Sequence, residues 1–209
     1  MGITAGVLEF FNRNLVLYPG LKMIELGDQE IYVGHELSYH WIKSFFELAG
    51  IDHTSIDING KGGALPLDMS QPIPDSHSYL KLNFDVLTDI GFGEHVSNQY
   101  HLFKNAHDLV KPGGLFLHEL PGQPYFDGHK ECYYYRPAFF AELSRLNGYE
   151  LLVNTLRLEI HYLGSFLCSV VMKKGPTVTD FINEETFRTL PIYTNVPMSN
   201  EEAIYLRKF

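Results

Sequence analysis

Apolar positions along the chain follow two different spacings, which predict alternating strands and helices. Helical spacing of apolar side chains occurs at residues 3–17, 35–50, 97–110 and 136–148. Short apolar runs typical of strands buried on both faces occur at residues 21–26, 53–58, 84–91 and 115–121. A further short strand or edge segment is expected at residues 64–70. This order predicts a three-layer α/β fold with a doubly wound, mostly parallel sheet.

Two longer runs with strand character follow, at residues 149–163 and 165–175, with only Gly164 between them. A connection this short requires an antiparallel pair, so a hairpin should complete one edge of a seven-stranded sheet. Residues 176–209 are expected to form an appended arm, with a short helix over 179–187 capped by Thr179 or Asp180. The predicted organisation is therefore one domain over residues 1–175, with an N-terminal helix within 1–20, and a C-terminal arm over 176–209.

Composition narrows the range of functions. The chain has 209 residues, of which 45% are hydrophobic, so it can bury a sizeable core. The formal net charge of -9 disfavours a surface that holds a nucleic-acid backbone. No apolar run approaches the length of a membrane span, and the N-terminus has no secretory pattern. We therefore expect no nucleic-acid or membrane partner and a cytoplasmic location.

Acidic residues stand at the ends of several predicted strands. Glu25 ends the first strand and is followed by Gly27, and Asp57 ends the second. Asp68 lies in the next short segment, and the sequence KPGG at 111–114 separates a helix from a strand. Open α/β sheets bind ligands at the carboxyl ends of their strands, so these residues predict a binding site there.

In the order of these motifs, residues 20–175 resemble a class I S-adenosylmethionine-dependent methyltransferase. The resemblance implies S-adenosylmethionine as the cofactor, with Asp57 on the ribose and Asp68 beside Met69 at the adenine. It also places the segment after the third long strand near the methionine part of the cofactor. The implied cofactor-binding residues are Glu25, Gly27, Asp57, Ile58, Asp68, Met69, Thr88, Asp89 and Ile90.

The loop after the first strand departs from the family, because Asp28, Gln29 and Glu30 stand where further glycines are usual. S-adenosylmethionine carries no phosphate, so its loop does not need a nest of amides aimed at an anion. The missing GxGxxG pattern disfavours a nicotinamide-dependent oxidoreductase. Because this loop has few glycines, one alternative stays open: a catalytically silent methyltransferase-like domain that acts as a binding or scaffold partner.

Candidate catalytic residues follow the third and fourth long strands. Glu94 and His95 lie after one strand and His118 near the end of the next, and an imidazole suits proton removal near neutral pH. The aromatic-rich loop over 121–137 suits a lid, with His129, Tyr133 and Tyr135 as candidate substrate contacts. No HxH or HExxH spacing is present, so no metal is expected. The predicted function is methyl transfer to oxygen or nitrogen of a small molecule, with a homodimer left open.

Overall fold

The computed structural model describes residues 3–31, 41–123, 133–159 and 165–194. Its helices are α1 (Ala5–Asn14), α2 (Ile42–Leu48), α3 (Gln99–Leu109), α4 (Pro137–Asn147) and α5 (Glu184–Phe187), with short 3-10 turns η1 (Lys61–Gly63), η2 (Asp75–Leu80) and η3 (Gly93–His95). Its strands are β1 (Lys22–Leu26), β2 (Asp52–Ile56), β3 (Phe84–Ile90), β4 (Val110–Pro121), β5 (Tyr133–Tyr134), β6 (Glu150–Glu159), β7 (Ser165–Lys173) and β8 (Tyr193–Thr194).

The main sheet has the strand order β2-β1-β3-β4-β7-β6. The first four strands are parallel, and β7 pairs antiparallel with both β4 and β6, as the sequence predicts. The expected seventh strand is not formed in the described chain, where Leu65 makes only an isolated parallel bridge to Ile56. Pro66 follows at once and has no backbone N–H to continue the ladder. The prediction of seven strands is therefore wrong by one.

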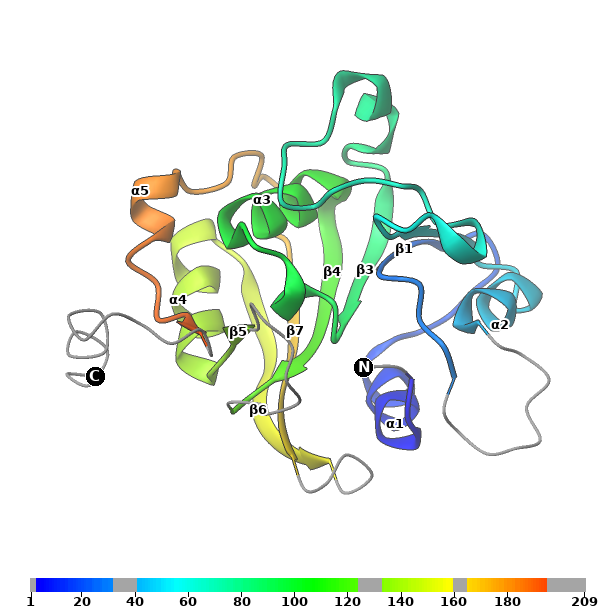
Figure 1. Cartoon of the computed structure of the whole chain (residues 1–209), viewed down its shortest axis with the longest axis horizontal. Helices are drawn as coiled ribbons and strands as arrows, with labels where there is room; N and C mark the ends of the chain where they lie inside the picture. Colours follow the sequence, from blue (N-terminus) through cyan, green and yellow to red (C-terminus); the bar gives the residue numbers. More distant parts are fainter. Residues whose placement is uncertain (1–2, 32–40, 124–132, 160–164, 195–209) are drawn as a thin grey trace.

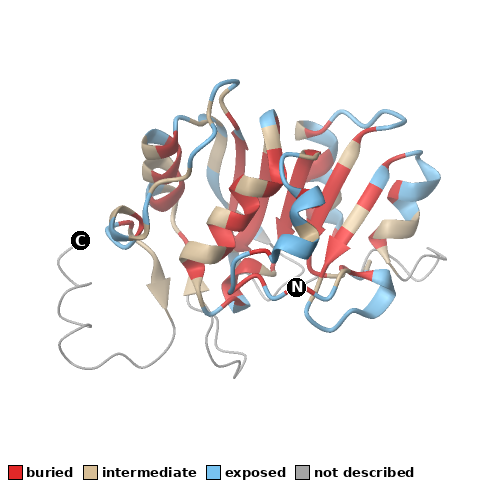
Figure 2. Cartoon of the chain, turned by 90° about the horizontal axis from the view of Figure 1, so that it is seen from above, coloured by how far each residue is buried: buried red, intermediate tan, exposed pale blue. Residues whose placement is uncertain are grey.

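Helices cover both faces of this sheet and make three layers. Helices α1 and α2 pack on one face, where Phe11 and Phe46 meet Met23 and Val86. Helices α3 and α4 pack on the other face, where Phe103 and Phe140 belong to the larger core cluster. Figure 2 shows buried strands in the centre and helices that expose their outer sides, and Figure 1 shows α2 at one end of the molecule with α4 and α5 at the other.

Helix ends agree with the sequence in two places and differ in a third. The Thr4 side chain caps α1 by accepting from Val7 N at 3.3 Å, and Gly148 ends α4 in the left-handed conformation. The short C-terminal helix begins later than expected, because Asn183, and not Thr179 or Asp180, is its N-cap. Residues 178–183 have no regular secondary structure, and Ile182 N donates to Asn147 Oδ1 at 2.9 Å.

The C-terminal segment over residues 176–194 packs against the domain. Phe187 and Leu190 are buried in the same core cluster as α3 and α4. Strand β8 then pairs with β5, so the end of this segment is joined to the chain that follows β4. The boundary at residue 175 stays a prediction, but the described arm shares its core with the rest of the fold.

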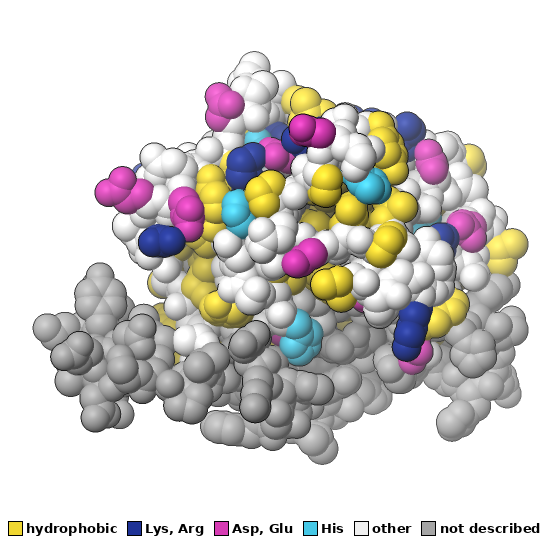
Figure 3. Space-filling view, turned by 45° about the horizontal axis from the view of Figure 1, so that its top comes forward, with side chains coloured by type: hydrophobic (Ala, Val, Ile, Leu, Met, Phe, Trp, Pro, Cys, Tyr) yellow, Lys and Arg dark blue, Asp and Glu magenta, His cyan; other side chains and the backbone are white. Residues whose placement is uncertain are grey.

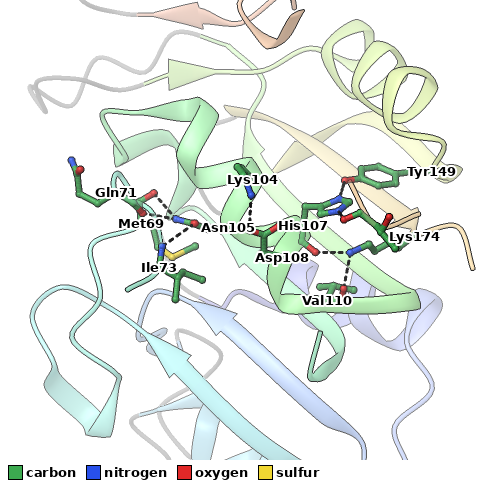
Figure 4. A network of polar contacts seen from close by, with 11 residues as sticks. Met69, Gln71, Ile73, Lys104, Asn105, His107, Asp108, Val110, Tyr149 and Lys174 are labelled. Carbon is green, nitrogen blue, oxygen red and sulfur yellow. Dashed lines mark hydrogen bonds and ion pairs between the residues drawn. The ribbon is translucent and has the colours of Figure 1, made fainter. Parts of the chain in front are cut away.

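A buried lysine fixes the far end of α3. Lys174 is fully buried, and its Nζ donates to the carbonyls of His107 at 2.7 Å and Val110 at 2.9 Å (Figure 4). These are carbonyls that a helix C-terminus leaves without intrahelical partners. Burial lowers the pKa of Lys174 to about 8. Both carbonyls lie far from the strand ends that carry the candidate site, so we assign Lys174 a structural role.

Candidate functional site

The carboxyl ends of the four parallel strands form one rim. Strand β1 lies between β2 and β3, with Leu26 aligned with Ile56 on one side and Asp89 on the other. The loops continue this alignment, because Gly27 N donates to Ile56 O at 2.7 Å and Gly91 N to Glu119 O at 3.0 Å. The rim therefore brings together the segments that start at residues 27, 57, 91 and 122.

The turn after β1 depends on its single glycine. Gly27 has a φ of 86°, and a Cβ there would lie 2.5 Å from Gln29 Nε2 and 3.1 Å from the Phe92 ring. Both the conformation and the space exclude a side chain. Gln29 is buried and its amide lies over the turn, with Nε2 3.5 Å from Leu26 O. A glutamine side chain thus occupies space beside the backbone that a second glycine would leave open.

Two carboxylates, Asp28 and Asp57, lie close enough at this part of the rim for their charges to interact. The Asp28 oxygens are closed off from solvent and have no hydrogen-bond donor in the described chain. They point at Gly62, where even a Cβ would clash with them. Burial, followed by the nearby charge of Asp57, raises the pKa of Asp28. Asp57 is half-buried, and its Oδ1 accepts from Asn59 N at 3.0 Å. This pair suits a ligand that donates hydroxyl protons or carries positive charge, and it repels phosphate.

A polar cluster lies beneath the β1 turn on the α1–α2 face of the sheet; we call it the Glu25 cluster. Glu25 is aligned with Ser55 of β2 and Thr88 of β3. His53 lies two residues before Ser55, on the same face of β2. All four side chains are buried, and the structure gives no hydrogen bond to their side-chain polar atoms within the described residues. His53 Nε2 is 3.6 Å from Glu25 Oε2, and its ring stacks on Phe46 at 5.4 Å.

Burial favours the neutral form of both ionisable members of this cluster. It raises the pKa of Glu25 well above its ordinary value, and Asp28 adds to that effect. Burial lowers the pKa of His53 to about 4, and Lys43 acts in the same direction. Near neutral pH, the neutral imidazole of His53 therefore lies beside a carboxyl group whose ionised form burial disfavours. This is consistent with support of the loop from beneath.

We expect Glu25→Gln to stabilise the protein increasingly as the pH rises. The unfolded carboxyl group ionises freely above about pH 4.5, whereas the folded one holds its proton, so wild-type stability from this group is present at low pH and falls as the pH rises. Each unit by which a pKa is raised corresponds to about 1.4 kcal/mol. Denaturant unfolding measures the difference in unfolding free energy between Glu25→Gln and the wild type. This difference should favour the variant by at least about 1 kcal/mol more at pH 8 than at pH 5. An equal difference at both pH values would contradict a neutral Glu25.

A second buried group of polar residues lies on the α3–α4 face. Asp89 Oδ1 accepts from Gly93 N at 2.9 Å, and its Oδ2 is 3.1 Å from His118 Nδ1. The remaining nitrogen of His118, Nε2, is buried and has no partner in the described chain, and the rings of Phe103 and Phe140 pack beside it. The Tyr135 hydroxyl donates to Gln99 Oε1 at 2.5 Å. These side chains shape the 91–96 loop from inside.

Several predicted site residues are interior rather than exposed. Tyr135 and His118 have almost no exposed surface, so their geometry favours support over contact with a substrate. Asp89 and Thr88 are fully buried, and Met69 belongs to the core. Gly27, Asp57, Asp89, Ile90 and Glu94 lie at or just after the carboxyl ends of neighbouring strands, and their roles in binding stay predictions.

Other predicted residues lie on the surface or outside the described chain. His95 is partly exposed, with Nε2 3.6 Å from Glu94 Oε1, whose side chain is buried. Ile58 is 68% exposed, and Asp68 is exposed in a turn where its Oδ1 accepts from Ser70 N at 2.9 Å. Tyr133 is half-buried and donates to Ser97 O at 3.0 Å. His129 lies outside the described residues.

Sequence reasoning missed Asn105, which holds the loop that carries Asp68. Its Nδ2 donates to Met69 O at 3.3 Å and to Gln71 O at 2.7 Å, and its Oδ1 accepts from Ile73 N at 3.3 Å (Figure 4). An asparagine on the apolar side of a helix was the available signal, because a buried amide requires partners. Asp28 and His53 were missed because only the fold shows what they face.

We expect Asn105→Ala to cost about 1–3 kcal/mol of stability, because it leaves buried backbone groups without partners. The loss should also release the 68–73 loop, because Asn105 makes three hydrogen bonds to its backbone. Denaturant unfolding and hydrogen exchange of residues 69–73 measure the two effects. Lys104→Ala is the control on the same helix, since it removes only a surface pair with Asp108. Unchanged exchange in the 69–73 loop would contradict the assignment.

Charged and hydrophobic side chains are mixed on the surface of the described residues (Figure 3). On the face shown in Figure 3, charged side chains of both signs are scattered among exposed hydrophobic ones, without a continuous basic patch among the coloured residues. The described residues contain no group of three or more His, Cys, Asp or Glu side chains placed to hold a metal ion. None of the helices in the described ranges has the length and apolar character needed to cross a bilayer.

Several solved structures that resemble this chain are methyltransferases. A putative S-adenosylmethionine-dependent methyltransferase from Listeria monocytogenes is 10% identical, with a TM-score of 0.59 over 81% of this chain and 98% of its own. The chain has the fold of a class I methyltransferase.

Two further structures agree with this fold. The Burkholderia thailandensis 1,6-didemethyltoxoflavin-N1-methyltransferase with S-adenosylhomocysteine is 15% identical, with a TM-score of 0.53 over 75% of this chain and 72% of its own. A Haemonchus contortus phosphoethanolamine N-methyltransferase with S-adenosylmethionine is 12% identical, with a TM-score of 0.55 over 81% of this chain. The chain spans only 52% of that enzyme's length. No protein-family model matches the sequence, and no curated protein matches it. At these identities the likeness establishes the fold alone.

Proposed function

We propose that the protein transfers a methyl group from S-adenosylmethionine to oxygen or nitrogen of a small molecule. The observation that carries this proposal is the closeness of two carboxylates, Asp28 and Asp57, whose charges interact beside the tight Gly27 turn. They lie at the carboxyl ends of adjacent parallel strands in a methyltransferase fold. This is where open α/β sheets bind nucleosides, and the acids favour a cofactor that has hydroxyls and positive charge but no phosphate.

In this proposal, the residues around the rim bind and orient while the cofactor supplies a reactive methyl group on a sulfonium. Gly27 lets the backbone approach the ligand, Asp57 accepts from the ribose hydroxyls, and Asp68 lies at the adenine. Methyl transfer then requires alignment of the acceptor, exclusion of water and, for a hydroxyl, removal of its proton. His95 is the better base candidate, because it is partly exposed at the rim while His118 is enclosed by aromatic rings.

Titration calorimetry with S-adenosylmethionine and S-adenosylhomocysteine tests the binding step directly. We expect both to bind the purified protein and adenosine to bind more weakly, because the acids around Gly27 also favour the amino acid part. ATP should bind far more weakly than adenosine, since its phosphates meet Asp28 and Asp57. Absence of binding by either cofactor form would overturn the proposal.

One observation favours the alternative of a catalytically silent binding domain, namely the buried Gln29 side chain beside the Gly27 turn. If Gln29 closes the cofactor site, Gln29→Gly should create measurable binding of S-adenosylhomocysteine where the wild type has none. If the site is open, the same substitution should change an existing affinity only modestly. A cytoplasmic location and a homodimer also remain predictions, and gel filtration with light scattering tests the latter.

A further inference from the structure

A cavity of about 560 Å³ lies between the start of α3, strand β5 and the C-terminal segment. Its walls come from parts of the chain that are far apart in sequence. Gln71 and Ser97 line it from the rim, Tyr133 from β5, and Phe187, Arg188 and Leu190 from the C-terminal segment. A volume of this size falls within the range of sites for small molecules.

The C-terminal wall of this cavity is held at both ends. His107 Nε2 is 3.2 Å from Thr179 O, and Asn147 Oδ1 accepts from Ile182 N at 2.9 Å. At the other end β8 pairs with β5, and the rings of Tyr134 and Tyr193 stack at 5.0 Å. Between these anchors, the Phe187 ring lies 5.7 Å from Tyr100. The cavity is therefore built by packing and is not a gap beside a loose tail.

The cavity adjoins the candidate cofactor rim. Gln71 follows the turn that carries Asp68, and Asn105 fixes its backbone. Ser97 follows η3, and Gln99 Nε2 donates to Gly93 O at 2.8 Å and Val96 O at 2.7 Å. One side of the cavity is thus formed by the same two loops that hold the adenine and catalytic candidates.

The lining indicates the chemistry of its ligand. Phe187 and Leu190 are buried members of the core, and Tyr100 and Tyr133 add aromatic surface. The two charged side chains, Arg188 and Glu184, neutralise each other through a contact of 2.8 Å. The rest of the lining is polar but uncharged, with Gln71, Ser97, Asn98 and Gln99 beside the aromatic rings. Aromatic surface, neutral polar groups and a mutually neutralised ion pair together favour a ligand that has a ring and no net charge.

We propose that this cavity binds the methyl acceptor and that the acceptor is an uncharged molecule with an aromatic ring. The proposal rests on the proposed function, because it assigns the second substrate of the same reaction. In this proposal, the C-terminal segment over residues 181–192 determines which acceptor binds.

Three naphthalene probes of similar size test the cavity by titration calorimetry in the presence of S-adenosylhomocysteine: neutral 2-naphthol, anionic 2-naphthoate and cationic 2-(aminomethyl)naphthalene. We expect 2-naphthol to bind at least about fivefold more tightly than either charged probe. Ser97→Trp should fill the cavity and weaken 2-naphthol at least about tenfold. The affinity of the Ser97→Trp variant for S-adenosylhomocysteine should stay within about twofold of the wild-type value. Ser78→Trp, at an exposed serine of η2, is the matched control and should change neither affinity.

A charge variant tests the ligand class independently. Arg188→Ala leaves Glu184 without its partner, so the cationic probe should gain affinity relative to 2-naphthol by about threefold or more. Arg145→Ala breaks a similar exposed pair with Glu142 on α4 and should not change this ratio.

These titrations distinguish a failure of the proposed function from a failure of the cavity assignment. No binding of S-adenosylhomocysteine by the wild type would overturn the proposed function. Normal cofactor binding with 2-naphthol unaffected by Ser97→Trp would overturn the cavity assignment alone. Tighter binding of either charged probe by the wild type would overturn the uncharged ligand class.

Discussion

Asp57→Ala should weaken binding of S-adenosylhomocysteine by at least about tenfold, which corresponds to about 1.4 kcal/mol. The carboxylate lies at the tip of β2 and is half-buried, and only its Oδ1 has a hydrogen bond, to Asn59 N, within the described residues. Its Oδ2 is therefore available for a ribose hydroxyl. Hydrogen bonds to a charged acceptor contribute about 1.5–3 kcal/mol, so the loss of binding should be large.

Asp57→Asn separates the binding role from a role in the turn. An asparagine keeps the side-chain oxygen that accepts from Asn59 N, but it loses the charge. We expect calorimetry to show weakened binding for both variants, with Asn intermediate. Asp52→Ala, at the exposed opposite end of β2, is the control for loss of one negative charge. Wild-type affinity for Asp57→Asn with poor affinity for Asp57→Ala would mean that Asp57 only shapes the turn.

Asp89→Ala should lower the free energy of unfolding by roughly 2–5 kcal/mol, because it removes a buried acceptor from two donors at once. Gly93 N–H and His118 Nδ1 would lose their shared partner in a site with no exposed surface. The variant also leaves a cavity under Gly93, where Asp89 Oδ2 now lies 2.6 Å from the position of a Cβ. Denaturant unfolding measures the loss.

Asp89→Asn is the matched variant, because it keeps the shape and one acceptor oxygen. We expect it to retain most of the stability, because Gly93 N can still donate to the side-chain oxygen at position 89. If Asp89→Asn binds S-adenosylhomocysteine as the wild type does, Asp89 positions the loop and does not contact the cofactor. A strong loss of affinity in this stable variant would restore the direct contact that the sequence predicts.

The parallel order of strands could be predicted from sequence because apolar runs and helix caps are local signals. Thr4 and Gly148 each mark an element boundary that the structure contains. The KPGG sequence, expected to separate a helix from a strand, lies inside β4, which begins at Val110. The local apolar pattern at residues 64–70 suggested a seventh strand, but Pro66 limits this segment to one bridge between Leu65 and Ile56. The late start of α5 depends on Asn147, a residue of another helix.

The candidate site was predictable only as a set of strand ends. Whether Asp89 faces His118 or the ligand depends on the register between β3 and β4, which includes an irregularity between Phe84 and Val86. Tyr135 looks like a lid residue in sequence, but it is buried because Gln99 and three phenylalanine rings surround it. Such partners come from distant segments, so spacing along the chain does not reveal them.

The pairing of β5 with β8 has a consequence for how this scaffold could be re-engineered. The loops proposed to face the nucleoside come from residues 27–95, whereas much of the proposed acceptor wall is one contiguous stretch near the end of the described chain. A graft that exchanges residues 181–194 while keeping Tyr133 and Tyr134 as the docking strand would alter the acceptor wall without touching the cofactor loops. Selection of new acceptors could thus be confined to a library of fourteen consecutive codons (194 − 181 + 1).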